Sequence, residues 1–139
     1  MNNLEKKNII VTGASGGIGN AIIKKLNEAG ANILASGTRI EKLEELKKNF
    51  EEIKILKFDI SQTDKIENFI ENATNELGGS LDGIINNAGI TQDNLAIRMT
   101  FDEWQKVINI NLTSTFLMSK FAIKKMLKNK SGKIVNITS

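Results

Sequence analysis

A glycine-rich turn near the start of the chain has the residue types and the spacing of a phosphate-binding loop. Residues 9–20 read IIVTGASGGIGN, an apolar run that leads into glycines and then into a helical pattern. Gly13, Gly17 and Gly19 would let the backbone approach a pyrophosphate closely, and the start of the following helix would offer unpaired N–H donors. A strand before the turn and a helix after it are the context that such a motif requires, so we predict dinucleotide binding. The alternative is a structural strand-to-helix turn.

Thr38 and Arg39 occupy the position that distinguishes the two nicotinamide cofactors. About twenty residues beyond the glycine turn, an NAD-binding unit places an acidic residue on the ribose hydroxyls. This chain has Thr38-Arg39 there, and an arginine pairs with a 2′-phosphate that a carboxylate would repel. The pair therefore favours NADPH over NADH. Alternatively, Arg39 is only an exposed residue in the first turn of a helix.

Polar and small residues follow two further apolar runs. Asp59 comes after the first of these runs, and the sequence NNAG at 86–89 comes after the second. Asp59 would accept a hydrogen bond from the adenine amino group, or else it belongs to a turn or a helix cap. In the NNAG run, the small residues would let a nucleotide lie against the strand end, and the amides would fix neighbouring loops. A plain turn is the alternative for this run.

Asn111 is an unexpected amide on a predicted buried helix face. The spacing places it among apolar residues and a threonine, namely Val107, Ile108, Leu112 and Thr115. Burying an unpaired amide costs about 1–3 kcal/mol, so Asn111 should have a specific partner. A water relay or a backbone-positioning role suits it. The alternative is a helix phase that differs by one residue.

Apolar runs and helical periods alternate along the whole chain, and they locate the elements that position these residues. Strands are predicted at residues 8–12, 31–36, 53–58, 81–85 and 133–137. Helices are predicted at 17–29, from a Thr38–Glu41 capping box, from a cap at Ser61, and from a Thr100–Glu103 capping box to about residue 128. Residues 86–99 form the longest predicted loop.

The core-facing residues of two helices follow from the same periodicity. One helix repeats Ile40, Leu43, Leu46 and Phe50, and the next carries Ile66, Phe69, Ile70, Ala73 and Leu77. Gly30 stands where a C′ glycine ends the first helix, and Gly78-Gly79 ends the third.

This alternation predicts an α/β fold, a Rossmann-type doubly wound parallel sheet with helices on both faces. The expected strand order is 3-2-1-4-5, and ligands of such sheets lie beyond the carboxyl ends of the strands. Those ends carry the glycine turn, Thr38-Arg39, Asp59, the NNAG run and Thr138-Ser139. We therefore expect residues 1–139 to form one dinucleotide-binding domain. It is expected to be incomplete at its carboxyl end, because the fifth strand would otherwise be an unpaired apolar edge.

Composition excludes several other classes of site. The chain has no cysteine and no histidine, so disulfides, thiol catalysis and the commonest metal ligands are absent, and no metal site is expected. A net charge of +3 is too small to suggest nucleic-acid binding. Without a membrane-length apolar run or a secretory signal, a cytoplasmic location is the simplest expectation. The lysine-rich stretch 120–133 is either a solvated helix end or a docking surface for an acidic partner.

These motifs together resemble the short-chain dehydrogenase/reductase family. The resemblance rests on Thr12-Gly13-x-x-x-Gly17-Ile18-Gly19, on NNAG at 86–89, on Asn111, and on a serine that ends the fifth strand. Residues 89–95, followed by Arg98-Met99, are most similar to the 3-oxoacyl-[acyl-carrier-protein] reductases of bacterial fatty acid synthesis. The similarity covers essentially all 139 residues.

The resemblance implies a role for each motif residue. The pyrophosphate would be held by Gly13, Ser15, Gly17, Ile18 and Gly19. Asp59 would meet the adenine, and the adenosine ribose would be lined by Asn87, Ala88 and Gly89. Ser139 would bond the substrate carbonyl, and Asn111 would hold a water in a proton relay. Hydride transfer from NADPH would convert a 3-oxoacyl thioester to a 3-hydroxyacyl thioester.

The same resemblance implies partners. The basic stretch around Lys130 would contact the acidic acyl carrier protein. The chain would form a homotetramer through its long fourth helix and later elements.

Two departures from the family pattern leave alternatives open. NADPH users of the family often have a basic residue just before the second motif glycine, where this chain has Gly16. The family's proton donor is a tyrosine, with a lysine four residues later to lower its pKa, and these 139 residues contain no tyrosine. The alternatives are a reductase of another ketone or sugar, or a non-catalytic cofactor-binding subunit.

Overall fold

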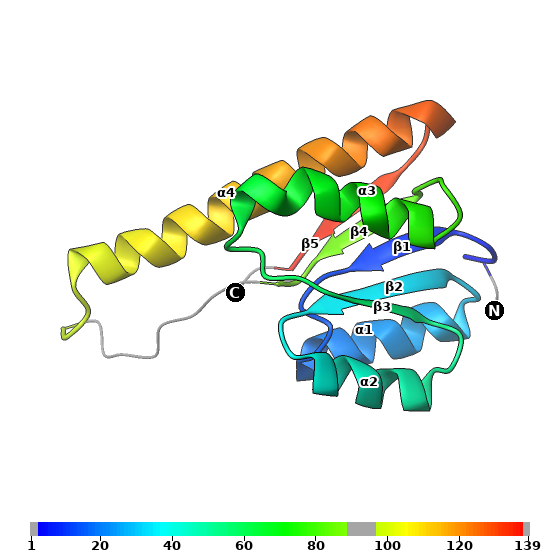
Figure 1. The fold of residues 1–139 in the computed structure, drawn as a ribbon, viewed down its shortest axis with the longest axis horizontal. Coiled ribbons are helices and arrows are strands. Elements are labelled where there is room, and N and C mark those ends of the chain that lie inside the picture. The colour runs from blue at the N-terminus through cyan, green and yellow to red at the C-terminus, as the bar shows by residue number, and fades with distance from the viewer. Residues whose placement is uncertain (1–2, 89–96, 138–139) are drawn as a thin grey trace.

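The computed structural model describes residues 3–88 and 97–137, which form a five-stranded parallel sheet flanked by helices (Figure 1). The strands are β1 (Asn8–Val11), β2 (Asn32–Gly37), β3 (Lys54–Lys57), β4 (Gly83–Asn86) and β5 (Lys133–Asn136). The α-helices are α1 (Gly17–Glu28), α2 (Ile40–Asn49), α3 (Ile66–Glu76) and α4 (Phe101–Met126), with 3₁₀ turns η1 (Thr63–Lys65) and η2 (Leu127–Asn129). The strand order β3-β2-β1-β4-β5 confirms the predicted topology.

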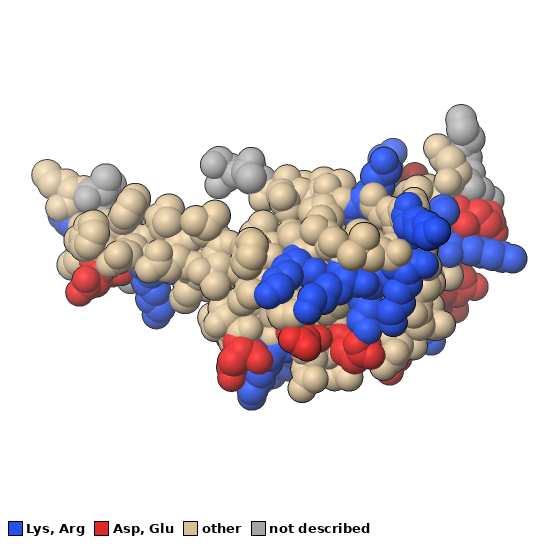
Figure 2. Space-filling view, turned by 90° about the horizontal axis from the view of Figure 1, so that it is seen from above, with Lys and Arg blue, Asp and Glu red and all other residues tan. Residues whose placement is uncertain are grey.

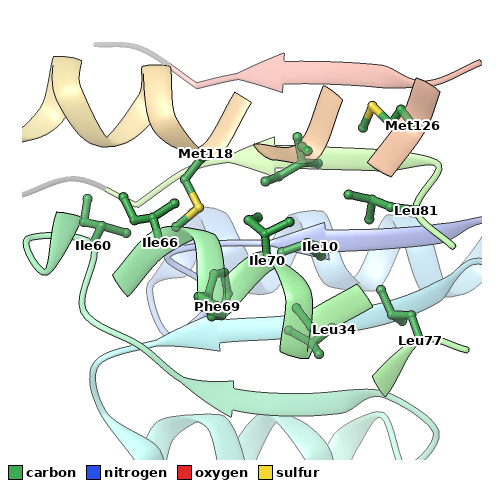
Figure 3. Packing of buried hydrophobic residues seen from close by; sticks show 13 residues of the cluster. Ile10, Leu34, Ile60, Ile66, Phe69, Ile70, Leu77, Leu81, Met118 and Met126 are labelled. Carbon is green, nitrogen blue, oxygen red and sulfur yellow. The ribbon is translucent and has the colours of Figure 1, made fainter. Parts of the chain in front are cut away.

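Alternating side chains of the central strands divide the core into two layers. Ile10 and Leu34 point toward α3 and α4, where they pack with Ile66, Ile70 and Met118 (Figure 3). The intervening residues of the same strands face the opposite layer, which α1 and α2 cover (Figure 1). Because successive side chains of a strand point to opposite faces, near-continuous apolar runs in β1 and β2 fit a sheet covered on both sides.

Some helix ends lie where the sequence predicted them, and others do not. Thr100 Oγ1 accepts a 3.1 Å bond from the Glu103 N–H, and the Glu103 carboxylate accepts a 3.2 Å bond from the Thr100 N–H. This capping box is therefore confirmed. Gly30 has a φ of +88° and ends α1 as predicted. The Thr38–Glu41 capping box is wrong, because Arg39 is the N-cap of α2 and no side chain caps it.

The predicted cap at Ser61 is also wrong. Asp59 Oδ1 accepts bonds from the Ser61 N–H (2.9 Å) and the Ser61 hydroxyl (2.8 Å), which forms a turn. The chain then passes through η1, and α3 begins only at Ile66. Aspartate competes for nearby backbone donors in this way, and the competition delays the helix.

Only the carboxyl-terminal part of α4 packs deeply on the sheet. Its buried stripe is Ser114, Met118, Ala122 and Met126, spaced by three or four residues. Ile108 and Leu112, which the sequence placed on the buried face, are 42% and 69% exposed. The amino-terminal half of α4 extends past the sheet, so an apolar side chain there has no strand beneath it (Figure 1). Asn111 is half-buried, one turn before Ser114.

Within residues 3–88 and 97–137, no helix is long and apolar enough to cross a membrane. The same described residues contain no group of three or more acidic, histidine or cysteine side chains that could hold a metal ion.

Candidate functional site

The carboxyl ends of β1, β2, β3 and β4 surround one cavity of about 240 Å³. Its lining includes six residues that the sequence singled out as cofactor contacts: Gly13, Ser15, Thr38, Asp59, Asn87 and Ala88. Parallel strands bring their carboxyl ends to the same edge of the sheet, which explains why segments far apart in sequence meet here. The predicted convergence of these residues is therefore present in the structure.

Two motif glycines are required by packing around the turn. Gly13 has a φ of +62°, and a Cβ added there would lie 2.8 Å from the backbone nitrogen of Ala88. A Cβ added to Gly19 would lie 2.4 Å from the Gly13 carbonyl oxygen. Side chains at these positions would collide with backbone atoms. Glycine at position 13 therefore lets the end of β1 approach the end of β4, and glycine at position 19 lets the start of α1 pack against the turn itself.

Gly17 serves a different purpose from these two glycines. A Cβ added to Gly17 would meet nothing within 4 Å, so the fold itself does not require glycine at this position. Gly17 begins α1, no described side chain caps that helix, and its first turn contains no acidic residue. Ile18 is 61% exposed beside it. The first turn of α1 therefore has neither a capping side chain nor an acidic residue of its own, and such an uncapped helix N-terminus is the arrangement that a pyrophosphate fits.

A hydrogen-bond network fixes the position of the NNAG run. Thr12 is buried, and its Oγ1 accepts bonds from the N–H of Asn87 (3.1 Å) and the N–H of Ala88 (3.0 Å). The Asn87 side chain donates a 3.1 Å bond to the Gly13 carbonyl. Asn86 donates a 2.9 Å bond to the side-chain oxygen of Asn136 on β5. The asparagine amides thus fix neighbouring segments, as the sequence indicated.

Asp59 forms a turn, which is one of the two alternatives that the sequence left open, and it also lines the cavity. It is exposed at the end of β3 and lines the cavity, while both of its bonds to Ser61 go to Oδ1. The turn holds the carboxylate at the rim of the cavity, where an amino group of a ligand can reach it.

Arg39 lies in a second groove next to the first cavity. This groove has a volume of about 350 Å³, and its lining combines the glycine turn and the start of α1 with one side of α2: Ala14, Ser15, Gly16, Gly17, Asn20, Arg39, Lys42, Glu45, Leu46 and Asn49. Ser15 lines both hollows, so the two adjoin at that residue. Thr38 and Arg39 are both exposed.

Asn111 stands apart from this cavity. Its carbonyl accepts a 3.2 Å bond from the hydroxyl of Ser114. Gly89 and Ser139 lie outside the described residues. Directly after β5, the Ile137 N–H donates a 3.0 Å bond to the Asn86 carbonyl, so the pairing with the end of β4 extends to residue 137.

Sequence reasoning missed several lining residues. Phe58 and Ile60 flank Asp59 and form an apolar wall, and the Phe58 ring stacks on Phe69 with centroids 4.4 Å apart. Their positions on either side of an aspartate at a strand end are the feature of the sequence that could have identified them. Lys42 was also missed, although it follows Arg39 by three residues on a predicted helix and therefore shares its side.

The basic stretch lies away from the cavity, over α3 and the end of α4, where blue side chains gather in Figure 2. Lys125 donates to Glu71 Oε2, and this ion pair holds the pKa of Glu71 below its usual value of 4.5. Lys120 and Lys124 lie over the ring of Phe121, with each Nζ about 5 Å from the centroid. Lys130, exposed and with a φ of +56°, follows at the end of η2. Part of this cluster is thus engaged within the fold, and the rest is open to solvent.

Comparison with known proteins gives relatives along the whole chain. The chain is 40% identical to a 3-oxoacyl-[acyl-carrier-protein] reductase FabG of Rickettsia conorii, over 100% of this chain and 56% of that protein. It is 39% identical to Nodulation protein G of Rhizobium sp. (strain N33), over 98% of this chain and 56% of that protein. The chain thus spans about half the length of these curated relatives.

A solved structure and a family model agree with these relatives. A short-chain type dehydrogenase/reductase from Mycobacterium marinum superposes with a TM-score of 0.88 at 27% identity, covering 98% of this chain and 57% of that one. The family model described as short chain dehydrogenase matches residues 7–139. With the glycine turn, the strand order and the polar strand ends in place, the chain belongs to the short-chain dehydrogenase/reductase family of oxidoreductases.

Proposed function

We propose that residues 1–139 form the cofactor-binding domain of an NADPH-dependent 3-oxoacyl-[acyl-carrier-protein] reductase of fatty acid synthesis. One observation carries the proposal: four strand ends bring the predicted contact residues to one cavity beside the open N-terminus of α1. Relatives that are about 40% identical and carry that reductase name support the substrate class. A cytoplasmic location is part of the same proposal.

The proposed contacts divide the cofactor among the strand ends. The pyrophosphate lies against the turn and the first residues of α1, held by Gly13, Ser15, Gly17, Ile18 and Gly19. Asp59 accepts a bond from the adenine, and Asn87, Ala88 and Gly89 line the adenosine ribose. Thr38 and Arg39 face the 2′-phosphate and thereby favour NADPH. When bound, the nicotinamide supplies the hydride for the 3-oxo carbon.

Two further residues are assigned to the substrate side. Ser139 donates a hydrogen bond to the substrate carbonyl, and Asn111 holds a water for proton delivery. A group that polarises a carbonyl and a group that delivers a proton each contribute orders of magnitude to such reactions. Members of the family use a tyrosine as the donor, a residue type that these 139 positions lack. The reaction as a whole is therefore proposed for the full-length protein that carries this sequence.

The partners are proposed on the same basis. Lys130 is exposed beside other lysines, and we assign it as a contact for the acidic acyl carrier protein. Exposed apolar side chains recur along α4 at Trp104, Ile108, Leu112 and Phe116. Their spacing of four residues makes one stripe, which suits contact with a second copy of the chain, and we assign it as one interface of a homotetramer.

The test is NADPH oxidation by the full-length protein with an acetoacetyl thioester, compared with free ketones and sugars that carry no thioester. The proposal predicts turnover of the thioester and little turnover of the others. Efficient turnover of a free ketone or sugar without turnover of the thioester would overturn the substrate class. NADPH binding without turnover of any of these substrates would favour a non-catalytic cofactor-binding subunit.

A further inference from the structure

The groove next to the first cavity is lined by a second cation, Lys42, in addition to Arg39. Its charged lining residues are Arg39, Lys42 and Glu45, all on the side of α2 that faces the glycine turn. Arg39 is the N-cap of α2 and Lys42 lies in its first turn, and both residues line the groove. A group that extends from the first cavity past Ser15 therefore enters a space with two cations.

Lys42 is held only weakly within the protein itself. Its Nζ lies 3.8 Å from Glu45 Oε2, and the two side chains are 44% and 65% exposed. Exposed pairs of this kind contribute little, because solvent screens them and both side chains lose freedom. Lys42 can therefore exchange this partner for a more highly charged one at small cost.

The opposite wall of the groove explains why a second cation is needed from α2. Gly16 lines the groove, and a Cβ added there would meet only the Gly13 carbonyl oxygen at 3.9 Å. The turn thus leaves open space and supplies no charge at the position where related NADPH enzymes often have a basic residue. A phosphate monoester carries about 1.5 to 2 negative charges at neutral pH, more than one arginine neutralises.

We infer that Lys42 is a second ligand of the cofactor's 2′-phosphate, acting with Arg39, and that Glu45 limits this affinity by competing for Lys42 and repelling the phosphate. The inference rests on the proposed preference for NADPH. It assigns cofactor selectivity to the first two turns of α2, on residues 39–45, and it makes Lys42 and Glu45 selectivity residues of opposite effect.

The experiment measures dissociation constants of NADPH and NADH for the full-length protein and for Lys42→Gln, Glu45→Gln and Lys48→Gln. Lys48 is the matched control, because it is an exposed lysine of the same helix that does not line the groove. Lys42→Gln should weaken NADPH binding about three- to tenfold and leave NADH binding unchanged. Glu45→Gln should strengthen NADPH binding about twofold or more, again without an effect on NADH. Lys48→Gln should change the dissociation constant of NADPH by less than either of these variants and should leave that of NADH unchanged.

The outcomes separate this inference from the proposal beneath it. If the unchanged protein binds NADH as tightly as NADPH, the proposed NADPH preference is wrong and the inference falls with it. If the unchanged protein prefers NADPH and Arg39→Gln reduces that preference, but Lys42→Gln behaves like Lys48→Gln, only the inference is overturned. Loss of NADH binding together with NADPH binding in Lys42→Gln would also overturn it, because the effect would not involve the 2′-phosphate.

Discussion

The side-chain amide of Asn87 donates a 3.1 Å hydrogen bond to the carbonyl of Gly13, and this bond joins the ends of β4 and β1. The two residues meet at the backbone as well, since a Cβ on Gly13 would lie 2.9 Å from the Asn87 carbonyl carbon. The glycine turn and the NNAG run are therefore one structural unit. Changes on either side should alter the shape of the cavity between them.

The buried Thr12 hydroxyl links the two parts of this unit, because it accepts hydrogen bonds from the NNAG run. In Thr12→Val, the N–H groups of Asn87 and Ala88 lose their shared acceptor, and we expect the free energy of unfolding to fall by about 2–4 kcal/mol. Thr12→Ser keeps the hydroxyl and should lose clearly less. Chemical denaturation of both variants gives the comparison; equal losses would mean that the methyl group, and not the acceptor, matters.

Gly13 should tolerate no side chain. Gly13→Ala would place a Cβ 2.8 Å from the backbone of Ala88 at a φ of +62°. Strain of this kind costs about 1–3 kcal/mol before the collision is counted. Thermal unfolding should therefore show a strongly destabilised or unfolded variant, whereas a melting temperature like that of the unchanged protein would contradict the packing described here.

Unlike the changes at Thr12 and Gly13, removal of the Thr74 hydroxyl should not lower the stability of the fold. Its Oγ1 is buried in α3, and no described residue gives it a hydrogen-bond partner. Thr74→Val replaces the hydroxyl by a methyl group of similar size, so stability should stay the same or rise by up to about 1 kcal/mol. A loss above about 1 kcal/mol on chemical denaturation would show that the hydroxyl is satisfied in solution. Thr74→Ala, which leaves a small cavity, should be less stable than Thr74→Val.

Glu71 makes stability depend on pH through its ion pair with Lys125. The pair lowers the pKa of Glu71 below 4.5 in the folded state. A lowered pKa means that the stabilisation is present above pH 4.5 and is lost as the pH falls through the folded-state value. Glu71→Gln should therefore be less stable than the unchanged protein at pH 7, and the difference should shrink toward pH 3. A difference that is constant across this range would exclude the ion pair as its cause.

Much of the fold and most of the cavity lining could be predicted from sequence, because both depend on local patterns. Apolar runs such as β1 locate the strands, and the strand order follows from the parallel connections. The polar residues at the strand ends then meet by topology alone. Gly13, Asp59 and Asn87 needed no tertiary information beyond this rule.

Other features of the fold depend on interactions or packing that the local sequence pattern does not reveal. Ser61 resembles a helix cap but is taken by Asp59 into a turn, so α3 begins five residues later, at Ile66. Ile108 and Leu112 have the spacing of a buried face, yet α4 extends past the sheet that would have covered them. Lys42 and Gly16 line the same groove only through the tertiary arrangement of α2 and the glycine turn.

The central claim is that the open N-terminus of α1 binds the cofactor pyrophosphate. Gly17→Ala tests it most directly, because a Cβ at this position meets nothing in the fold but would project into the proposed phosphate site. Alanine is also the better helix former, so stability should be unchanged or rise by up to about 1 kcal/mol.

The measurement is the dissociation constant of NADPH for the full-length protein and for Gly17→Ala, with the unfolding free energy of each as the control. We expect at least about tenfold weaker NADPH binding in a variant that is fully folded. Undiminished NADPH binding by the folded variant would contradict it.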